Sequence, residues 1–169
     1  MRKLNILKTL VDFAFFFGVF AIATMTIFVP FTLTDPDGME VTLNGQKIVT
    51  SGIPEKILMV VALISGLFFI YSIYLLRKVI GFFMKRDLFN DKVISHLNTI
   101  GIFLVASALL TSFSTFCFKM FQDQEVGLAI TSGGFDSFLL AVSLGLFFMV
   151  LSEVFKIAKN MKEENELTI

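Results

Sequence analysis

The sequence lacks most of the residues on which catalytic, metal-binding and disulfide-bonded proteins depend. Its one cysteine, Cys117, excludes an internal disulfide and a multi-cysteine metal site. Its one histidine is too few for the spaced ligands of a typical zinc site. No catalytic or nucleotide-binding motif occurs in the 169 residues. We therefore expect a protein without a cofactor and without enzymatic activity.

Charge and tryptophan are also scarce. Tryptophan is absent, only 17% of the residues are charged, and the formal net charge is zero. A neutral chain has no overall attraction to nucleic acid, so direct nucleic-acid binding is not expected. Hydrophobic residues instead make up 56% of the chain, and it has 22 phenylalanines. A soluble fold of this size could not bury so much apolar surface, and we expect the surplus to face lipid.

The apolar residues are gathered into four stretches. Residues 13–34, 57–76 and 98–118 contain no charged side chain, and each is close to the roughly 20 residues that cross a bilayer as a helix. Residues 137–152 are fewer, but they make a full span if Asp136 and Glu153 lie at the two surfaces. The predicted fold is a single-domain, all-α integral membrane protein, a four-transmembrane-helix bundle. Its spans are expected at about residues 10–33, 57–78, 98–120 and 136–158.

The distribution of basic residues predicts the orientation. Of the 14 lysines and arginines, three lie in the N-terminal segment, five in the middle connection and three in the C-terminal tail. Short cytoplasmic segments carry such an excess of Lys and Arg. Both termini, the middle connection and the tail at residues 159–169 are therefore expected in the cytoplasm.

The first outer connection is expected to form a small extracytoplasmic β-hairpin at residues 39–50. Two short runs flank Asn44-Gly45, a dipeptide that favours the type I′ turn of two-residue hairpins. The alternative is a loop without fixed pairing, because an isolated hairpin is only marginally stable in water. In the middle connection we expect the second helix to run to Lys85 and break at Asp87. Asn90 or Asp91 can then cap the third helix.

Three ionisable residues lie near the inner ends of the predicted spans: Asp12, His96 and Glu153. Ionisable groups at membrane depth are functional candidates, here for a proton relay or a cation site. The alternative is that Asp12 stabilises a helix N-terminus through the macrodipole and Glu153 pairs with Lys156. His96 would then be solvated at the membrane surface.

Hydroxyl side chains mark one face of the third predicted helix. Ser107 and Thr111 are one turn apart and therefore lie on the same side. They could line a polar pathway through the membrane. Alternatively, they hydrogen-bond their own helix or a neighbour, as such residues commonly do in helix packing.

Two segments resemble an uncharacterised bacterial membrane family, catalogued as domain of unknown function twenty-nine seventy-five. The first is FNDKVISHL at residues 89–97, followed by Ile100-Gly101, and the second is the tail, with LSEVFK at 151–156 and EENELTI at 163–169. Val93 stands where many members have asparagine. The resemblance implies a bacterial inner-membrane protein and no particular activity. Genes of the family often lie beside one for a small helix-turn-helix regulator, which implies such a regulator as a cytoplasmic partner.

The leading hypothesis is therefore a non-enzymatic membrane interaction protein that binds a cytoplasmic transcriptional regulator through its inner face. The expected docking residues belong to the middle connection and the tail: Phe89, Leu97, Lys156, Glu163, Glu164 and Glu166. One alternative is a small oligomeric transporter or channel, with Glu153 and the hydroxyl face lining its pathway. Another is an immunity-type protein that protects its host membrane.

Overall fold

The computed structural model of the protein describes residues 2–35, 38–43, 46–122 and 132–167. Four helices account for most of these residues: α1 (Arg2–Thr34), α2 (Ile53–Met84), α3 (Asp91–Gln122) and α4 (Ser132–Leu167). Each contains a stretch long and apolar enough to cross a membrane. The prediction of a mainly helical fold with four helices long and apolar enough to span a membrane is confirmed. The predicted spans lie within these helices, which all extend beyond them.

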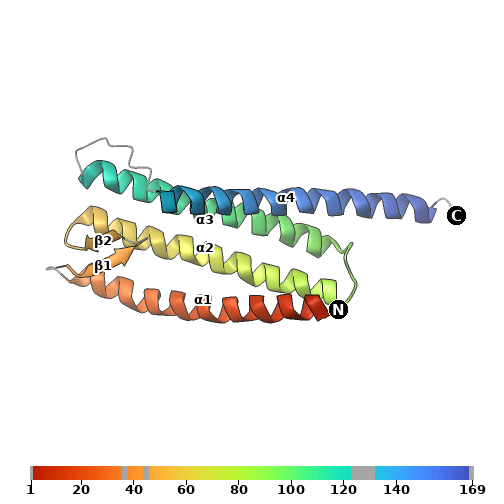
Figure 1. Ribbon diagram of the computed structural model, residues 1–169, viewed down its shortest axis with the longest axis horizontal. Coiled ribbons are helices and arrows are strands. Elements are labelled where there is room, and N and C mark those ends of the chain that lie inside the picture. The colour runs from red at the N-terminus through yellow and green to blue at the C-terminus, as the bar shows by residue number, and fades with distance from the viewer. Residues whose placement is uncertain (1, 36–37, 44–45, 123–131, 168–169) are drawn as a thin grey trace.

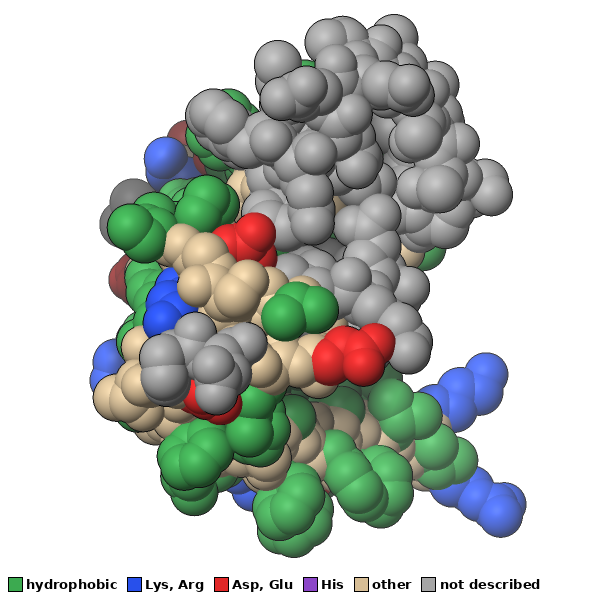
Figure 2. Space-filling view, turned by 90° about the vertical axis from the view of Figure 1, so that its left-hand side faces the viewer, with side chains coloured by type: hydrophobic (Ala, Val, Ile, Leu, Met, Phe, Trp, Pro, Cys, Tyr) green, Lys and Arg blue, Asp and Glu red, His purple; other side chains and the backbone are tan. Residues whose placement is uncertain are grey.

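The helices pack in chain order, α1 on α2, α2 on α3 and α3 on α4. The two termini and the α2–α3 connection lie at one end of the molecule, and the strands lie at the other (Figure 1). Because α1 packs mainly on α2, much of its surface is exposed, including Phe16 and Phe20, each 68% exposed. An end-on view shows hydrophobic side chains along the edge where α1 lies (Figure 2). In a membrane this face contacts lipid.

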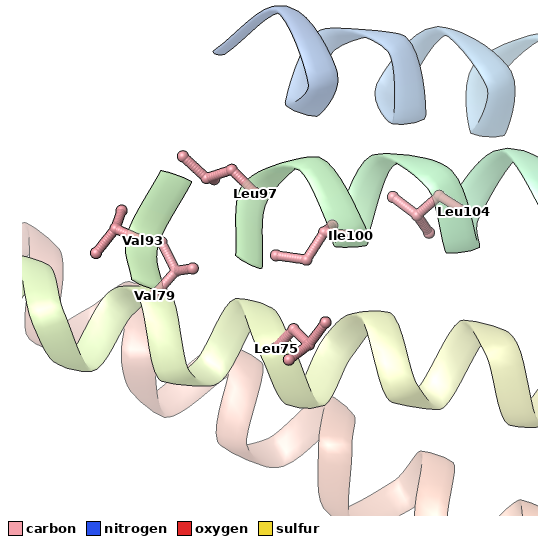
Figure 3. Packing of buried hydrophobic residues seen from close by; sticks show 6 residues of the cluster. All are labelled: Leu75, Val79, Val93, Leu97, Ile100 and Leu104. Atoms are coloured by element: carbon pink, nitrogen blue, oxygen red, sulfur yellow. The ribbon is translucent and has the colours of Figure 1, made fainter. Parts of the chain in front are cut away.

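The hydrophobic core is concentrated near the α2–α3 connection. Its fully buried members lie between α2 and α3 and on the side of α3 toward α4 (Figure 3). Phe148, Leu151 and Phe155 of α4 pack against this cluster. The core residues are Leu75, Val79, Val93, Leu97, Ile100 and Leu104. Among the described side chains, the main buried cluster thus lies toward the end that carries the termini.

Glycines allow α3 and α4 to approach closely. A Cβ atom on Gly101 would lie 2.5 Å from the carbonyl oxygen of Gly145 and would also collide with Met149. A Cβ atom on Gly145 would lie 2.9 Å from the carbonyl oxygen of Gly101. Small residues at such crossings let the backbones of membrane helices come into contact. The α3–α4 crossing therefore depends on both glycines.

The turn between α2 and α3 is short and hydrogen-bonded. Helix α2 ends at Met84, and Arg86 adopts a left-handed conformation with φ 60°. The predicted break at Asp87 is therefore slightly late, because the chain already leaves the helix at Lys85. The Asn90 side chain accepts a hydrogen bond from the Lys92 backbone N–H at 3.0 Å. This confirms Asn90 as the residue that caps α3.

Strands β1 (Glu40–Leu43) and β2 (Gln46–Val49) pair antiparallel, with Glu40 opposite Val49 and Leu43 opposite Gln46. The Asn44-Gly45 dipeptide lies outside the described residues, so the type I′ turn stays a prediction. At the same end, the Lys56 ammonium donates hydrogen bonds to the carbonyl oxygens of Leu33 at 3.1 Å and Asp35 at 3.3 Å. Lys56 thereby satisfies carbonyls at the C-terminal end of α1 and ties it to α2.

Candidate functional site

Most of the predicted functional residues gather at the end of the molecule that carries both termini (Figure 1). We call it the basic end, because lysines and arginines flank all four helices there. They include Lys3, Lys8, Arg77, Lys78, Lys85, Arg86, Lys92, Lys156, Lys159 and Lys162. Here α4 runs past the start of α3 and the α2–α3 turn.

An aromatic cluster holds α4 against that turn. The rings of Phe83 and Phe155 are stacked, with centroids 5.8 Å apart, and Phe89 lies 6.4 Å from Phe155. The ammonium of Lys162 lies over the Phe89 ring, 5.8 Å from its centroid. Aromatic pairs and cation–π contacts of this kind each contribute about 0.5–1.5 kcal/mol. The turn and α4 therefore form one continuous surface.

An ion pair adds a second link between α4 and α3. The Lys159 ammonium contacts both carboxylate oxygens of Asp91 at 2.7 Å. Lys159 also lies 3.5 Å from Glu163, and Lys162 lies 3.6 Å from Glu166. The hydrogen bond to Asp91 raises the pKa of Lys159, which lies outside the predicted spans. Sequence reasoning missed this pair, because Asp91 and Lys159 are far apart in the chain and nothing local indicates their contact.

The structure places the six predicted docking residues differently. Lys156, Glu163, Glu164 and Glu166 are exposed on α4, and Phe89 is 37% exposed in the turn. Leu97 is only 1% exposed, because it packs in the core between α3 and its neighbours. Including Leu97 in a docking surface was therefore wrong, since a partner could not reach it without unfolding this end. The remaining five residues are exposed, and Phe89, Lys156, Glu163 and Glu166 make up the candidate docking surface. Glu164 is seven residues after Ile157 and therefore lies on a different side of α4.

Asp12 pairs with a residue of a different helix. Its carboxylate lies 2.5 Å from Nε of Arg77 on α2, and the Arg77 guanidinium lies over the Phe15 ring, 5.4 Å from its centroid. Helix α1 begins at Arg2, so Asp12 is well beyond the first turn, where the macrodipole acts. The macrodipole interpretation of Asp12 was therefore wrong. Both residues lie near the inner limits of their predicted spans and link α1 to α2.

This pair yields a testable prediction. Replacing Asp12 with asparagine is expected to lower the free energy of unfolding by about 1 kcal/mol, the upper end for an exposed ion pair. The effect is this small because the Asp12 and Arg77 side chains are 33% and 46% exposed, so that solvent screens the pair. The Asp12→Asn/Arg77→Gln double variant should lose less than the two single variants together. Strictly additive losses in a denaturant titration would show that the two side chains are not coupled.

His96 and Glu153 do not join Asp12 in a common site. The His96 ring lies 6.5 Å from the Phe82 ring, and burial, followed by the charges of Lys78 and Lys92, lowers its pKa. Glu153 is exposed on α4, and among the described residues it has no ion pair with Lys156. The described part of the chain contains no cluster of three His, Cys, Asp or Glu side chains that could hold a metal. The geometry therefore does not support the cation-site hypothesis within that part.

The hydroxyl face of α3 meets a serine of α2. The Ser65 hydroxyl lies 2.5 Å from that of Thr111 and 3.2 Å from that of Ser107, and it donates to the Ser107 carbonyl at 3.0 Å. Thr111 also donates to the Ser107 carbonyl at 3.0 Å. Ser65 and Ser107 are buried, 4% and 8% exposed. These hydroxyls satisfy one another between two helices, which favours packing over a polar pathway. Sequence reasoning missed Ser65, although it is an isolated polar residue inside an apolar run.

Comparison with known families identifies the chain over nearly its whole length. A family model described as Protein of unknown function (DUF2975) matches residues 8–169. The chain belongs to the DUF2975 family. No curated protein and no solved structure matches this DUF2975 protein. The family resemblance based on residues 89–101 and the tail is thus confirmed, and the match also covers α1 from residue 8 onward and both strands.

Proposed function

We propose that this DUF2975 protein is a non-enzymatic interaction protein of the bacterial cytoplasmic membrane. Its basic end would bind a cytoplasmic helix-turn-helix regulator. The observation that carries the proposal is the attachment of α4 to the α2–α3 turn, through the Phe83–Phe155 stack and the Asp91–Lys159 pair. A tail held in this way presents its exposed side chains in fixed positions, so little ordering free energy is lost on binding.

The orientation of the molecule supports this location. All the lysines and arginines that define the basic end lie on one side of the four apolar stretches, as in cytoplasmic segments of membrane proteins. With the basic end in the cytoplasm, strands β1 and β2 lie on the extracytoplasmic side. The length of α4 supports a surface beyond the membrane. Its 36 residues make it about 54 Å long, whereas the hydrocarbon core is about 30 Å thick.

The candidate docking surface has the mixed character of a specific protein interface. Phe89 offers an aromatic ring that is 37% exposed and contacts Lys162. The C-terminal part of α4 also carries exposed side chains of both signs, namely Lys156, Glu163 and Glu166. An aromatic residue bordered by polar groups is typical of protein–protein interfaces. The proposed partner binds this surface, and the partner contacts DNA, whereas the membrane protein does not.

The test is a crosslinked pull-down from native membranes, analysed by mass spectrometry. The full-length protein is expected to capture a soluble protein of the size of a DNA-binding regulator. Deletion of residues 162–169 and the Phe89→Ala and Lys156→Glu variants should each lose it. Phe89→Ala removes a hot-spot type of side chain, and we expect at least about a tenfold loss of capture, corresponding to about 1.4 kcal/mol.

Lys92→Glu provides the matched control, because Lys92 is an exposed lysine of the basic end that lies outside the docking surface. It should capture the partner as well as the unmodified protein does. Equal capture by the full-length, tail-deleted and Phe89→Ala forms would refute the proposal.

A further inference from the structure

A continuous line of exposed apolar residues runs along α4. Its members recur at intervals of three and four residues, and each is between 43% and 69% exposed. We call this line the α4 seam. It consists of Leu140, Leu144, Phe147, Val150, Val154, Ile157 and Met161.

The α4 seam faces away from the rest of the molecule. Gly145, Ser152 and Lys159 recur every seven residues on α4 and all contact α3. Residues that share this position of the seven-residue repeat lie on one side of the helix. Phe147, Val150, Val154 and Ile157 lie on the opposite side of α4. The seam is therefore on the outer side of α4, where no other described element covers it.

Lipid can cover the part of the seam from Leu140 to Val150, but it does not cover Val154, Ile157 and Met161. Ser152 donates a hydrogen bond to the Ile94 carbonyl at 2.7 Å, and Lys159 pairs with Asp91. Val154, Ile157 and Met161 therefore lie level with the first two turns of α3, before the predicted span of that helix begins at residue 98. The α4 span, predicted to reach residue 158, then ends earlier, near Glu153, the residue expected at the inner surface. The C-terminal part of α4 projects beyond the other helices in Figure 1. Val154, Ile157 and Met161 are 52%, 53% and 58% exposed, and a contiguous apolar line of this kind, unlike a single exposed residue, indicates an interaction site.

The arrangement of charges around the seam suits an identical partner. Lys156, Lys159, Lys162, Glu163 and Glu166 all occupy positions of the seven-residue repeat away from the seam. The positions that flank it beyond Glu153 are uncharged, namely Ala158, Asn160 and Asn165. Two copies in one membrane share the same orientation, so their α4 helices would meet parallel and in register. No like charges would face each other until Glu164, where the seam ends.

We propose that the protein forms a parallel homodimer through the α4 seam, with Val154, Ile157 and Met161 packed against the same residues of a second copy beyond the membrane. The hydrophobic effect drives this part of the contact, because it removes apolar surface from water. The proposal is independent of the regulator, whose docking surface lies on another side of α4 around Phe89 and Lys156. Either proposal can fail while the other holds.

Cysteine crosslinking in native membranes tests the dimer. Cys117 is first replaced by serine, and single cysteines then replace Ile157 or Met161 on the seam, with Lys156 and Lys162 as matched control positions on the same helix turns. In a parallel two-fold dimer, equivalent seam positions bring Cβ atoms within disulfide range, about 3.5–4.5 Å. Mild oxidation is expected to shift most of the Ile157→Cys and Met161→Cys protein to dimer mass. The two control variants should stay monomeric.

A second variant keeps the result interpretable. Adding Val154→Glu to the Met161→Cys protein should abolish its crosslinking, because two carboxylates would meet at the dimer axis. The amount of protein in the membrane fraction should not change, since Val154 is exposed in the monomer. Crosslinking at all four positions alike, at none of them, or to a protein of different mass would each overturn the proposed dimer.

Discussion

Replacing Gly101 with alanine is expected to lower the free energy of unfolding by about 2–3 kcal/mol, the upper part of the range for overpacked sites. The added methyl group would lie 2.5 Å from the Gly145 carbonyl oxygen and 3.1 Å from the Met149 backbone nitrogen. Both atoms belong to the backbone of α4, so no side-chain rotation relieves the collision. The two helices must separate, and the contacts on both sides of the crossing weaken with them.

The matched control is Gly81→Ala on α2. A Cβ atom there meets nothing within 4 Å, and alanine in a helix is about 0.5–1 kcal/mol more favourable than glycine. Gly81→Ala should therefore be neutral or stabilising. SDS titration of the detergent-solubilised protein, followed by tyrosine fluorescence, measures both variants, because Tyr71 packs edge-on against Phe103 of α3 at 5.0 Å. A Gly101→Ala protein as stable as Gly81→Ala would contradict the close α3–α4 crossing.

The Leu97→Ala variant is expected to lose about 2–5 kcal/mol of stability, the range for emptying a buried leucine site. Leu97 is 1% exposed and belongs to the cluster that joins α2, α3 and α4 at the basic end. The loss should be accompanied by faster hydrogen exchange in the first turns of α3, measured by mass spectrometry. Any loss of partner capture by this variant should follow the loss of folded protein.

Leu97→Met separates packing from recognition. Methionine nearly conserves the volume, so this variant should lose less than about 1.5 kcal/mol and keep full partner capture. If Leu97→Met lost capture while remaining stable, Leu97 would be a contact residue after all. The burial of Leu97 would then not describe the state that binds the partner.

The four helices follow from the sequence because their causes are local. Stretches without charged residues, each long enough to cross a bilayer, require helices, since a backbone in lipid must satisfy its own hydrogen bonds. The capping of α3 by Asn90 is equally local, because the side chain bonds a backbone N–H two residues away. The end of α2 was predicted slightly late because a helix commonly ends at a glycine in the left-handed conformation. Here Arg86 adopts that conformation, and an arginine gives no such signal in the sequence.

The contacts between helices could not be predicted in the same way. Asp12 was expected to stabilise its own helix and pairs with Arg77 of α2 instead. Ser107 and Thr111 were recognised as sharing a face, whereas their partner Ser65 was not. From the segment at residues 89–97 alone, Leu97 could equally be an exposed docking residue or a buried one. It is buried because the neighbouring helices pack against it. Each outcome depends on which faces of two helices meet.

The sequence by itself therefore determined the number of helices, their apolar character and the gathering of basic residues at one end. Hydrophobicity, charge and capping act within one segment, so a single segment is enough to reveal them. Only the tertiary structure decided that α1 packs mainly on α2, that Gly101 meets Gly145, and that Asp91 and Lys159 hold the end of α4 in place. These contacts join residues distant in the chain, and lipid satisfies an apolar helix face as well as another helix does, so hydrophobicity alone does not select which faces pack.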